Sequence, residues 1–188
     1  IAIPADSGDV AALTNAVDWC ATELGRLDIL VNNAGVFPSG PFEDVTLEEL
    51  DRTMAVHAKA AFVAAQAAAK HMTEGGRIIN IGSSLAERVP YAGVTLYAMS
   101  KSALIGLTKG LARDLGPRGI TANLVHPGST DTDMNPANGA AAADEIPFIA
   151  LGRYGTPEDV AATVAHLAGP GGRYITRASI AIDGGVTA

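Results

Sequence analysis

Short, continuous apolar segments alternate with longer helical segments along this 188-residue chain, and this alternation constrains its fold more than any other feature. Five segments have the length and composition of buried strands: Ile1–Ala5, Ile29–Asn32, Arg77–Ile81, Thr121–Val125 and Ala178–Ile182. Strands that are apolar on both faces must be covered on both faces, and helices between them provide the cover. The pattern therefore predicts an α/β fold with a doubly wound parallel sheet.

Four segments between the strands have helical character: Val10–Leu24, Leu47–His71, Tyr97–Leu115 and Pro157–Leu167. Ser7 or Asp9 can cap the first helix, and Thr46 with Glu49 forms a capping box ahead of the second. Gly116-Pro117 ends the third helix. No internal repeat interrupts this order, so we expect a single domain over residues 1–188.

Composition excludes several classes of protein. The net charge is −7, with 13 basic and 20 acidic residues, and phosphate binding needs a basic face, so nucleic acid is not the expected partner. No apolar run is long enough to span a bilayer without glycine or charge. The single cysteine, Cys20, excludes an internal disulfide, and its helical context predicts core packing. With no secretory signal pattern, we expect a cytoplasmic protein.

Five segments near the predicted strand ends occur in a characteristic order. They are LDILVNNAG (Leu27–Gly35), IINIGS (Ile78–Ser83), YAMSK (Tyr97–Lys101), HPGSTDTDM (His126–Met134) and IDGG (Ile182–Gly185). Together they resemble the short-chain dehydrogenase/reductase family, and the chain looks most similar to its bacterial branch around 3-oxoacyl-acyl-carrier-protein reductases. The resemblance implies a Rossmann-like fold. It also implies hydride transfer between NAD or NADP and a small-molecule carbonyl compound or secondary alcohol.

Tyr97 and Lys101 lie four residues apart and therefore share one helix face. A free phenol, with a pKa near 10, is a poor base at neutral pH, but a nearby ammonium group favours the phenolate. The resemblance implies that Tyr97 exchanges a proton with the substrate oxygen and that Lys101 also binds the nicotinamide ribose. The alternative is a core tyrosine beside a lysine with a buried stem.

Ser83 follows a predicted strand directly, and the resemblance implies that its hydroxyl holds the substrate oxygen near Tyr97. Counted back from Tyr97, Ser84 matches the more common spacing and is the rival. We favour Ser83, because a strand end is held more firmly than a loop.

His57 stands where the family usually has an asparagine that orders a water leading to the lysine. A neutral imidazole can accept and donate hydrogen bonds as an amide does, but it titrates near pH 6.5. One interpretation is that His57 replaces the asparagine as a catalytic residue and that activity falls on mild acidification. The other is a helical histidine satisfied by a backbone carbonyl.

The resemblance also implies a set of cofactor-binding residues and no metal. They are Asp6, Asn33, Ala34, Gly35, Tyr97, Lys101, Pro127, Gly128, Thr130 and Thr132. Glycine at position 35 lets the backbone approach a ligand closely, although a tight turn alone would explain it. Asp6 can equally cap the first helix.

The segment Thr132–Ile149 is rich in turn formers and small residues, which predicts a mobile lid or an ordinary surface loop. It does not define the substrate. Two non-enzymatic alternatives stay open: a nucleotide-binding or regulatory protein on a dehydrogenase scaffold, and a structural subunit or inactive fragment. An intact set of Ser83, Tyr97 and Lys101 favours the enzyme.

The stretch MAVHAKAAFVAAQAAAKHM of the helix Leu47–His71 is small and apolar around most of its circumference, and the helix Tyr97–Leu115 carries apolar residues at Ala103, Leu104, Leu107 and Leu111, so one sheet cannot cover them. Together with the family resemblance, this predicts a homodimer or homotetramer built on these two helices.

No Gly-rich turn of the kind that receives a pyrophosphate links a strand to a helix in this chain. Compared with the family, the first two strand-helix units are absent, and the chain resembles the family from its third strand onward. We therefore expect an incomplete domain with weak dinucleotide affinity, in which Ile1–Ala5 is displaced. The choice between NAD and NADP is not determined by these residues.

Overall fold

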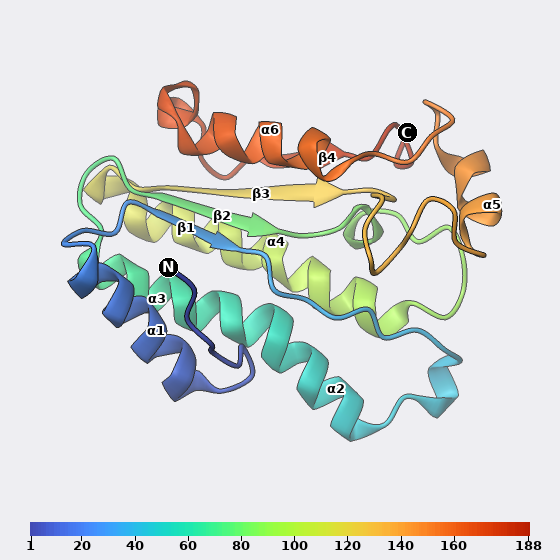
Figure 1. Ribbon diagram of the computed structural model, residues 1–188, viewed down its shortest axis with the longest axis horizontal. Helices are drawn as coiled ribbons and strands as arrows, with labels where there is room; N and C mark the ends of the chain where they lie inside the picture. The colour runs from blue at the N-terminus through green and yellow to red at the C-terminus, as the bar shows by residue number, and fades with distance from the viewer.

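The computed structural model describes residues 1–188 and contains one four-stranded parallel sheet between two layers of helices (Figure 1). The strands lie side by side in chain order: β1 (Ile29–Asn32), β2 (Arg77–Ile81), β3 (Thr121–Pro127) and β4 (Ser179–Ile182). All three neighbouring pairs are parallel. The predicted α/β parallel sheet is confirmed, and β3 extends two residues further than predicted.

The α-helices are α1 (Val10–Glu23), α2 (Leu47–Met54), α3 (Ala60–His71), α4 (Thr95–Leu115), α5 (Ala142–Glu145) and α6 (Pro157–Ala168). Short 3-10 helices lie at Phe42–Asp44, Ser84–Ala86, Gly116–Arg118, Ile146–Phe148 and Pro170–Tyr174. Asp9 caps α1, and Thr46 with Glu49 forms the expected capping box of α2. The predicted helix Leu47–His71 is instead two α-helices joined by a π-helical turn, Ala55–Lys59.

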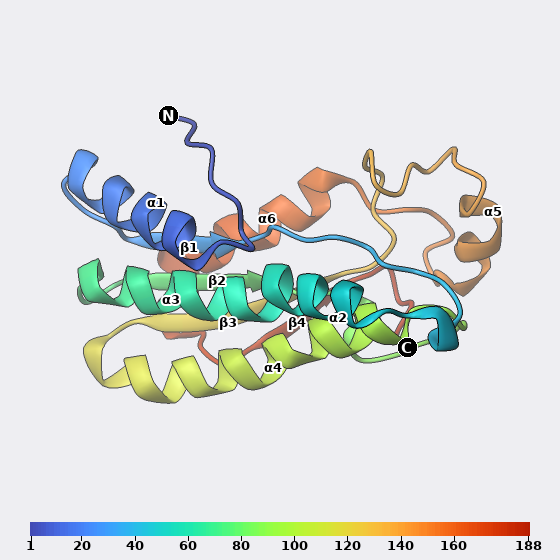
Figure 2. The same ribbon diagram turned by 90° about the horizontal axis from the view of Figure 1, so that it is seen from below.

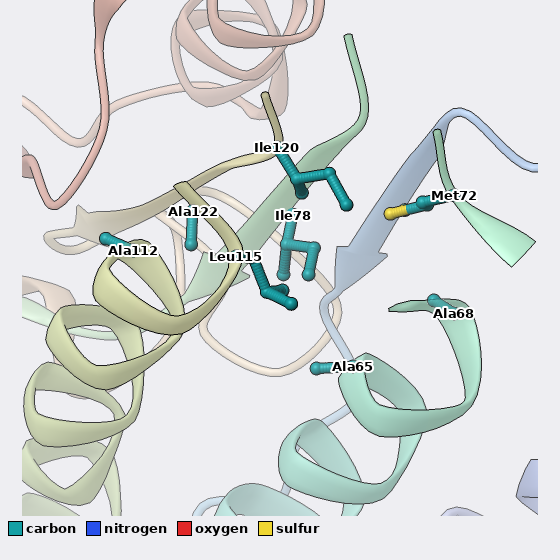
Figure 3. Close-up of a cluster of buried hydrophobic side chains, with 8 residues drawn as sticks. All are labelled: Ala65, Ala68, Met72, Ile78, Ala112, Leu115, Ile120 and Ala122. Carbon is teal, nitrogen blue, oxygen red and sulfur yellow. The ribbon is translucent and has the colours of Figure 1, made fainter. Parts of the chain in front are cut away.

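Adjacent residues of β2 pack on opposite faces of the sheet, because successive strand side chains point to opposite sides. Ile78 packs with residues of α3 and α4, and Figure 3 shows this cluster of Ala65, Ala68, Met72, Ile78, Ala112, Leu115, Ile120 and Ala122. Ile79 packs on the other face with Leu167 of α6. Figure 1 shows α6 on one side of the sheet and α1, α3 and α4 on the other, and in Figure 2 these three helices lie side by side on the face turned to the viewer.

A chain of polar side chains crosses the core between β1, β2 and α4. The amide of Asn32 donates to Asn80 Oδ1 at 2.8 Å, and the amide of Asn80 donates to Thr108 Oγ1 at 2.9 Å. Asn80 and Thr108 are buried. The network therefore ties the carboxyl ends of two strands to the middle of α4.

The prediction that Ile1–Ala5 forms a buried strand is wrong. These residues are exposed, belong to no sheet, and make no ladder hydrogen bonds (Figure 1). A strand needs a partner for its backbone groups, and β1 pairs only with β2. The expected displacement of this segment is therefore observed, and β1 is an edge strand with Ile29 and Val31 exposed.

Two smaller observations concern the helices. Cys20 of α1 is half-buried and unpaired, so its packing is looser than the predicted core position. None of the helices combines the length and apolarity that crossing a bilayer would require.

Replacement of Ile78 by alanine tests the core around β2. Its side chain has no exposed surface, so Ile78→Ala should lower the free energy of unfolding by about 3 kcal/mol. Urea denaturation measures the change. The control is Val89→Ala, at a position that is 52% exposed, for which a change within about 0.5 kcal/mol is expected. Equal losses for the two variants would contradict the assignment of Ile78 to the core.

Candidate functional site

A cavity of about 1100 Å³ lies at the carboxyl ends of β1, β2 and β3, which is where parallel α/β sheets bind ligands. Its walls come from the segments that follow these strands, the start of α4, α5 and α6. The predicted site residues that line it are Asn33, Ala34, Gly35, Ser83, Tyr97, Lys101, Pro127, Gly128, Thr130 and Thr132. Asp6 and His57 are not among the lining residues.

Asp6 lies in the exposed segment ahead of α1. Its Oδ1 accepts a hydrogen bond from the backbone amide of Gly8 at 2.8 Å, which closes a local turn. The alternative role as helix cap belongs to Asp9, whose carboxylate accepts from Ala11 and Ala12. The structure therefore gives Asp6 a local turn and no place in the cavity.

Ser83 follows β2 after a glycine that the packing requires. A Cβ at Gly82 would lie 2.6 Å from Nδ1 of the buried His126, too close for any other residue. Ser83 begins the 3-10 helix Ser84–Ala86, and its Oγ accepts from the Leu85 amide at 3.2 Å. Both Ser83 and Ser84 are buried in the cavity wall.

The phenol of Tyr97 is surrounded by the predicted partners. Burial raises the pKa of Tyr97, and interaction with the nearby Ser83 side chain acts in the opposite direction. This interaction favours Ser83 over Ser84 as the serine that faces the phenol. The ring of Phe37 contacts the Tyr97 ring edge-on, with centroids 4.7 Å apart.

Lys101 lies one helical turn after Tyr97, with its ammonium group buried. Nζ donates to the carbonyl of Ile81 at 3.0 Å and lies 5.8 Å from the centroid of the Tyr97 ring. Burial lowers the pKa of Lys101 to about 8. The expectation that the ammonium brings down the tyrosine pKa is not met here, because burial dominates and the ammonium binds a carbonyl.

His57 lies in the π-helical turn, behind the loop that follows β1, and is 2% exposed. The amide of Val36 donates to its Nε2 at 2.9 Å, which leaves the proton on Nδ1, 2.8 Å from Ser100 Oγ. The Ser100 hydroxyl donates in turn to the Tyr97 carbonyl at 2.7 Å. His57 thus links the loop Gly35–Val36 to the start of α4 by hydrogen bonds. Its partners are a backbone amide and a hydroxyl, and not the backbone carbonyl of the alternative interpretation.

The expected loss of activity on mild acidification requires His57 to titrate near pH 6.5. Burial, followed by the charge of Lys101, lowers the pKa of His57 to about 4. The imidazole therefore stays neutral in mild acid, so titration of His57 would not lower the activity there. The role of His57 in ordering a water that leads to Lys101 stays a prediction.

His126, which sequence analysis did not single out, contacts the backbone of Ser83 directly. Its Nδ1 accepts from the Ser83 amide at 3.1 Å and lies 2.7 Å from the Ser83 carbonyl oxygen. Its Nε2 lies 2.8 Å from Ser179 Oγ, whose hydroxyl donates to Glu87 at 3.2 Å. The sequence feature that could have indicated this role is a histidine near the carboxyl end of the apolar strand TANLVHP.

The sheet order, the cavity at its carboxyl edge and the glycine-containing strand ends are those of a Rossmann-like α/β protein. Residues 1–187 match the family model described as enoyl-(acyl carrier protein) reductase. The cyclic-di-GMP-binding biofilm dispersal mediator protein of Escherichia coli K12 is 46% identical over 184 residues, which are 95% of this chain and 78% of that protein.

Two solved structures are closely similar. A short-chain dehydrogenase from Burkholderia cenocepacia J2315 in complex with NADP has 59% identity and a TM-score of 0.99, over 100% of this chain and 77% of that one. A blue fluorescent protein from a metagenomic library in complex with NADPH has 58% identity and a TM-score of 0.97, over 98% and 74% of the two chains. The chain belongs to the short-chain dehydrogenase/reductase family. The predicted family and its Rossmann-like fold are confirmed.

Replacement of His57 by asparagine tests its buried neutral state. The unfolded chain binds a proton at His57 below about pH 6.5, whereas the folded protein does so only near pH 4. This contribution to stability is therefore complete above pH 6.5 and is lost as the pH falls toward 4. Urea denaturation gives the fall in the free energy of unfolding between pH 7 and pH 4. This fall should be smaller in His57→Asn than in the unaltered chain by roughly 3 kcal/mol. His71→Asn, at a partly exposed histidine, is the control. If His57→Asn retained the full pH dependence of the unaltered chain, the assignment would be wrong.

Proposed function

We propose that this chain transfers a hydride between NAD(P)(H) and a small carbonyl compound or secondary alcohol, with Ser83, Tyr97 and Lys101 as its reactive residues. The observation that carries the proposal is their convergence on one cavity at the carboxyl edge of the sheet. Ser83 hydrogen-bonds the substrate oxygen, and Tyr97 donates or accepts its proton. Membership in the family supports both roles.

The cavity wall fits a dinucleotide in part. A Cβ at Gly35 would lie 3.2 Å from His57 Nε2 and 3.4 Å from Lys101 Nζ, so glycine keeps the backbone beside the ammonium clear. Thr130, Thr132 and Asn33 add hydroxyl and amide groups to the wall. When bound, the nicotinamide supplies or accepts the hydride. The relatives solved with NADP and NADPH support the phosphorylated cofactor.

The protonation states favour reduction at neutral pH. Burial keeps Tyr97 protonated, so its hydroxyl can donate to a carbonyl oxygen that is gaining negative charge. Lys101, with a pKa of about 8, is still mainly an ammonium at neutral pH and places a positive charge on the same cavity wall.

Replacement of Tyr97 by phenylalanine tests this function. With NADPH and a panel of ketones, Tyr97→Phe should lower the rate of cofactor oxidation by at least about 100-fold, because it removes the proton donor. Tyr174→Phe, at a tyrosine that is 98% exposed, is the matched control and should keep the rate of the unaltered chain. A rate that survives Tyr97→Phe would reject the proposed role.

A second candidate function is that of a nucleotide-binding regulatory protein. It is favoured by the similarity to the Escherichia coli relative, whose name describes it as cyclic-di-GMP-binding. Calorimetric binding of cyclic di-GMP without turnover of any ketone or alcohol would support this candidate over the enzyme. Turnover that depends on Tyr97 would support the enzyme.

We also propose a homo-oligomer built on α3 and α4. Both helices carry small apolar residues along most of their length. Two of their large apolar side chains are nevertheless exposed, Phe62 of α3 at 53% and Met99 of α4 at 47%. A second copy would remove these side chains from water.

Light scattering at micromolar concentration should give at least twice the mass of the 19.1 kDa chain. Phe62→Lys, which places a charge in the proposed interface, should shift the mass toward that of one chain. Val89→Lys, on an exposed loop outside both helices, is the control. A monomeric mass for the unaltered chain would contradict the proposal.

A further inference from the structure

Glu145, the last residue of α5, brings a carboxylate into the wall of the cavity that Ser83 and Tyr97 also line. It belongs to the segment Thr132–Ile149, whose composition does not define a substrate. In the structure this segment is folded around a small cluster of Ala142, Ile149, Tyr154 and Val186. Glu145 is therefore held on an ordered part of the wall.

Three donors converge on one oxygen of this carboxylate. The hydroxyl of Tyr154 donates to Glu145 Oε2 at 2.7 Å, the amide of Asn135 donates at 3.1 Å, and the hydroxyl of Ser129 also donates to it. The donors lie before, within and after the segment, so they fix the carboxylate in one orientation. The pKa of the Tyr154 phenol is raised to about 12 by burial and then by its bond to Glu145.

The other oxygen, Oε1, receives no hydrogen bond from any protein group and forms no ion pair. It is also absent from the buried polar atoms that lack a partner, so it remains open to solvent or to a ligand. A carboxylate oxygen accepts hydrogen bonds readily, most strongly from a cationic donor. Glu145 thus has one oxygen fixed by the protein and one available.

The surroundings of Glu145 connect it to the reactive phenol. Tyr91, Tyr97 and Glu145 line the same cavity, and burial together with the charge of Glu145 raises the pKa of Tyr91. Tyr91, Met134 and Phe148 supply apolar wall on the same cavity. Lys101 is the only basic residue that lines it, and its ammonium binds the Ile81 carbonyl. No protein cation neutralises Glu145.

We propose that Glu145 selects the substrate: its open oxygen binds a protonated amine, or another hydrogen-bond donor, on a carbonyl compound whose body contacts Tyr91 and Phe148, and its charge excludes carboxylates. This inference rests on the proposed function and names the substrate class of the same site. Because the three donors already fix the carboxylate, little conformational freedom is lost when the ligand binds. Rejection of an anion follows from the uncompensated negative charge.

The competing explanation is that Glu145 only holds the segment together. Glu145→Gln distinguishes the two, because the amide oxygen can still accept from Tyr154, Asn135 and Ser129 while the charge is removed. Tyr154→Phe makes the opposite change, since it removes one of these donors and keeps the charge. Asp133→Asn removes another carboxylate of the cavity wall and is the matched control for general electrostatics.

The experiment measures dissociation constants by NMR titration for three acetophenones that carry a para aminomethyl, hydroxymethyl or carboxylate group. The unaltered chain should bind the amine most tightly and the carboxylate most weakly. Glu145→Gln should reduce the ratio of carboxylate to amine dissociation constants by roughly fivefold or more. Tyr154→Phe and Asp133→Asn should leave this ratio within about twofold of the original.

Equal binding of the three ketones by the unaltered chain, or no binding of any, would overturn the inference even if the Glu145→Gln chain failed to fold. An unchanged ratio in Glu145→Gln, or an equal change in Asp133→Asn, would also overturn it. Turnover of the same ketones with NADPH is measured separately. Selective binding without turnover would count against the proposed function while supporting the selectivity of Glu145.

Discussion

The hydrogen-bonded chain of Asn32, Asn80 and Thr108 fixes the register on which the rest of the site depends. Asn80 lies three residues before Ser83, and Thr108 lies on the helix that carries Tyr97 and Lys101. A shift of α4 along the sheet would break these bonds and leave buried amides without partners, which would lower the stability of the fold. The serine and the phenol are therefore placed relative to one another by polar contacts in the core, and the cavity follows from that placement.

Burial controls the charges around this cavity more than pairing does. It lowers the pKa of Lys101, His57 and His126 and raises that of Tyr97, so each group is moved toward its neutral form. The two histidines, although close to reactive residues, stay neutral and act as fixed hydrogen-bonding partners of backbone groups. The site is thus built from neutral donors and acceptors, with Lys101 as the cation nearest the phenol.

Much of the fold could be predicted, because strand and helix periodicity and the capping residues are local signals. Ile29–Asn32 and Arg77–Ile81 form strands with the predicted bounds, and Thr46 with Glu49 caps α2 as expected. The prediction of a strand at Ile1–Ala5 was wrong because apolar composition does not show whether a neighbouring strand is present to pair with. The convergence of Ser83, Tyr97 and Lys101 could be predicted from strand-end motifs. The roles of His126 and Glu145 could not, since His126 contacts a residue 43 positions away and the donors to Glu145 lie 9 to 16 positions away.

The π-helical turn Ala55–Lys59 has a consequence for how this part of the chain can vary. A π-turn holds one more residue than an α-helical turn, so it offsets the faces of α2 and α3 by about 100° relative to a continuous helix. Loss of one residue here would restore a continuous α-helix and leave the buried alanines of α3 facing the sheet, because the shortened turn spans the same rotation. Such a deletion would act mainly on His57, which lies in the turn and is buried. The extra residue of this segment is therefore tied to the inward direction of His57.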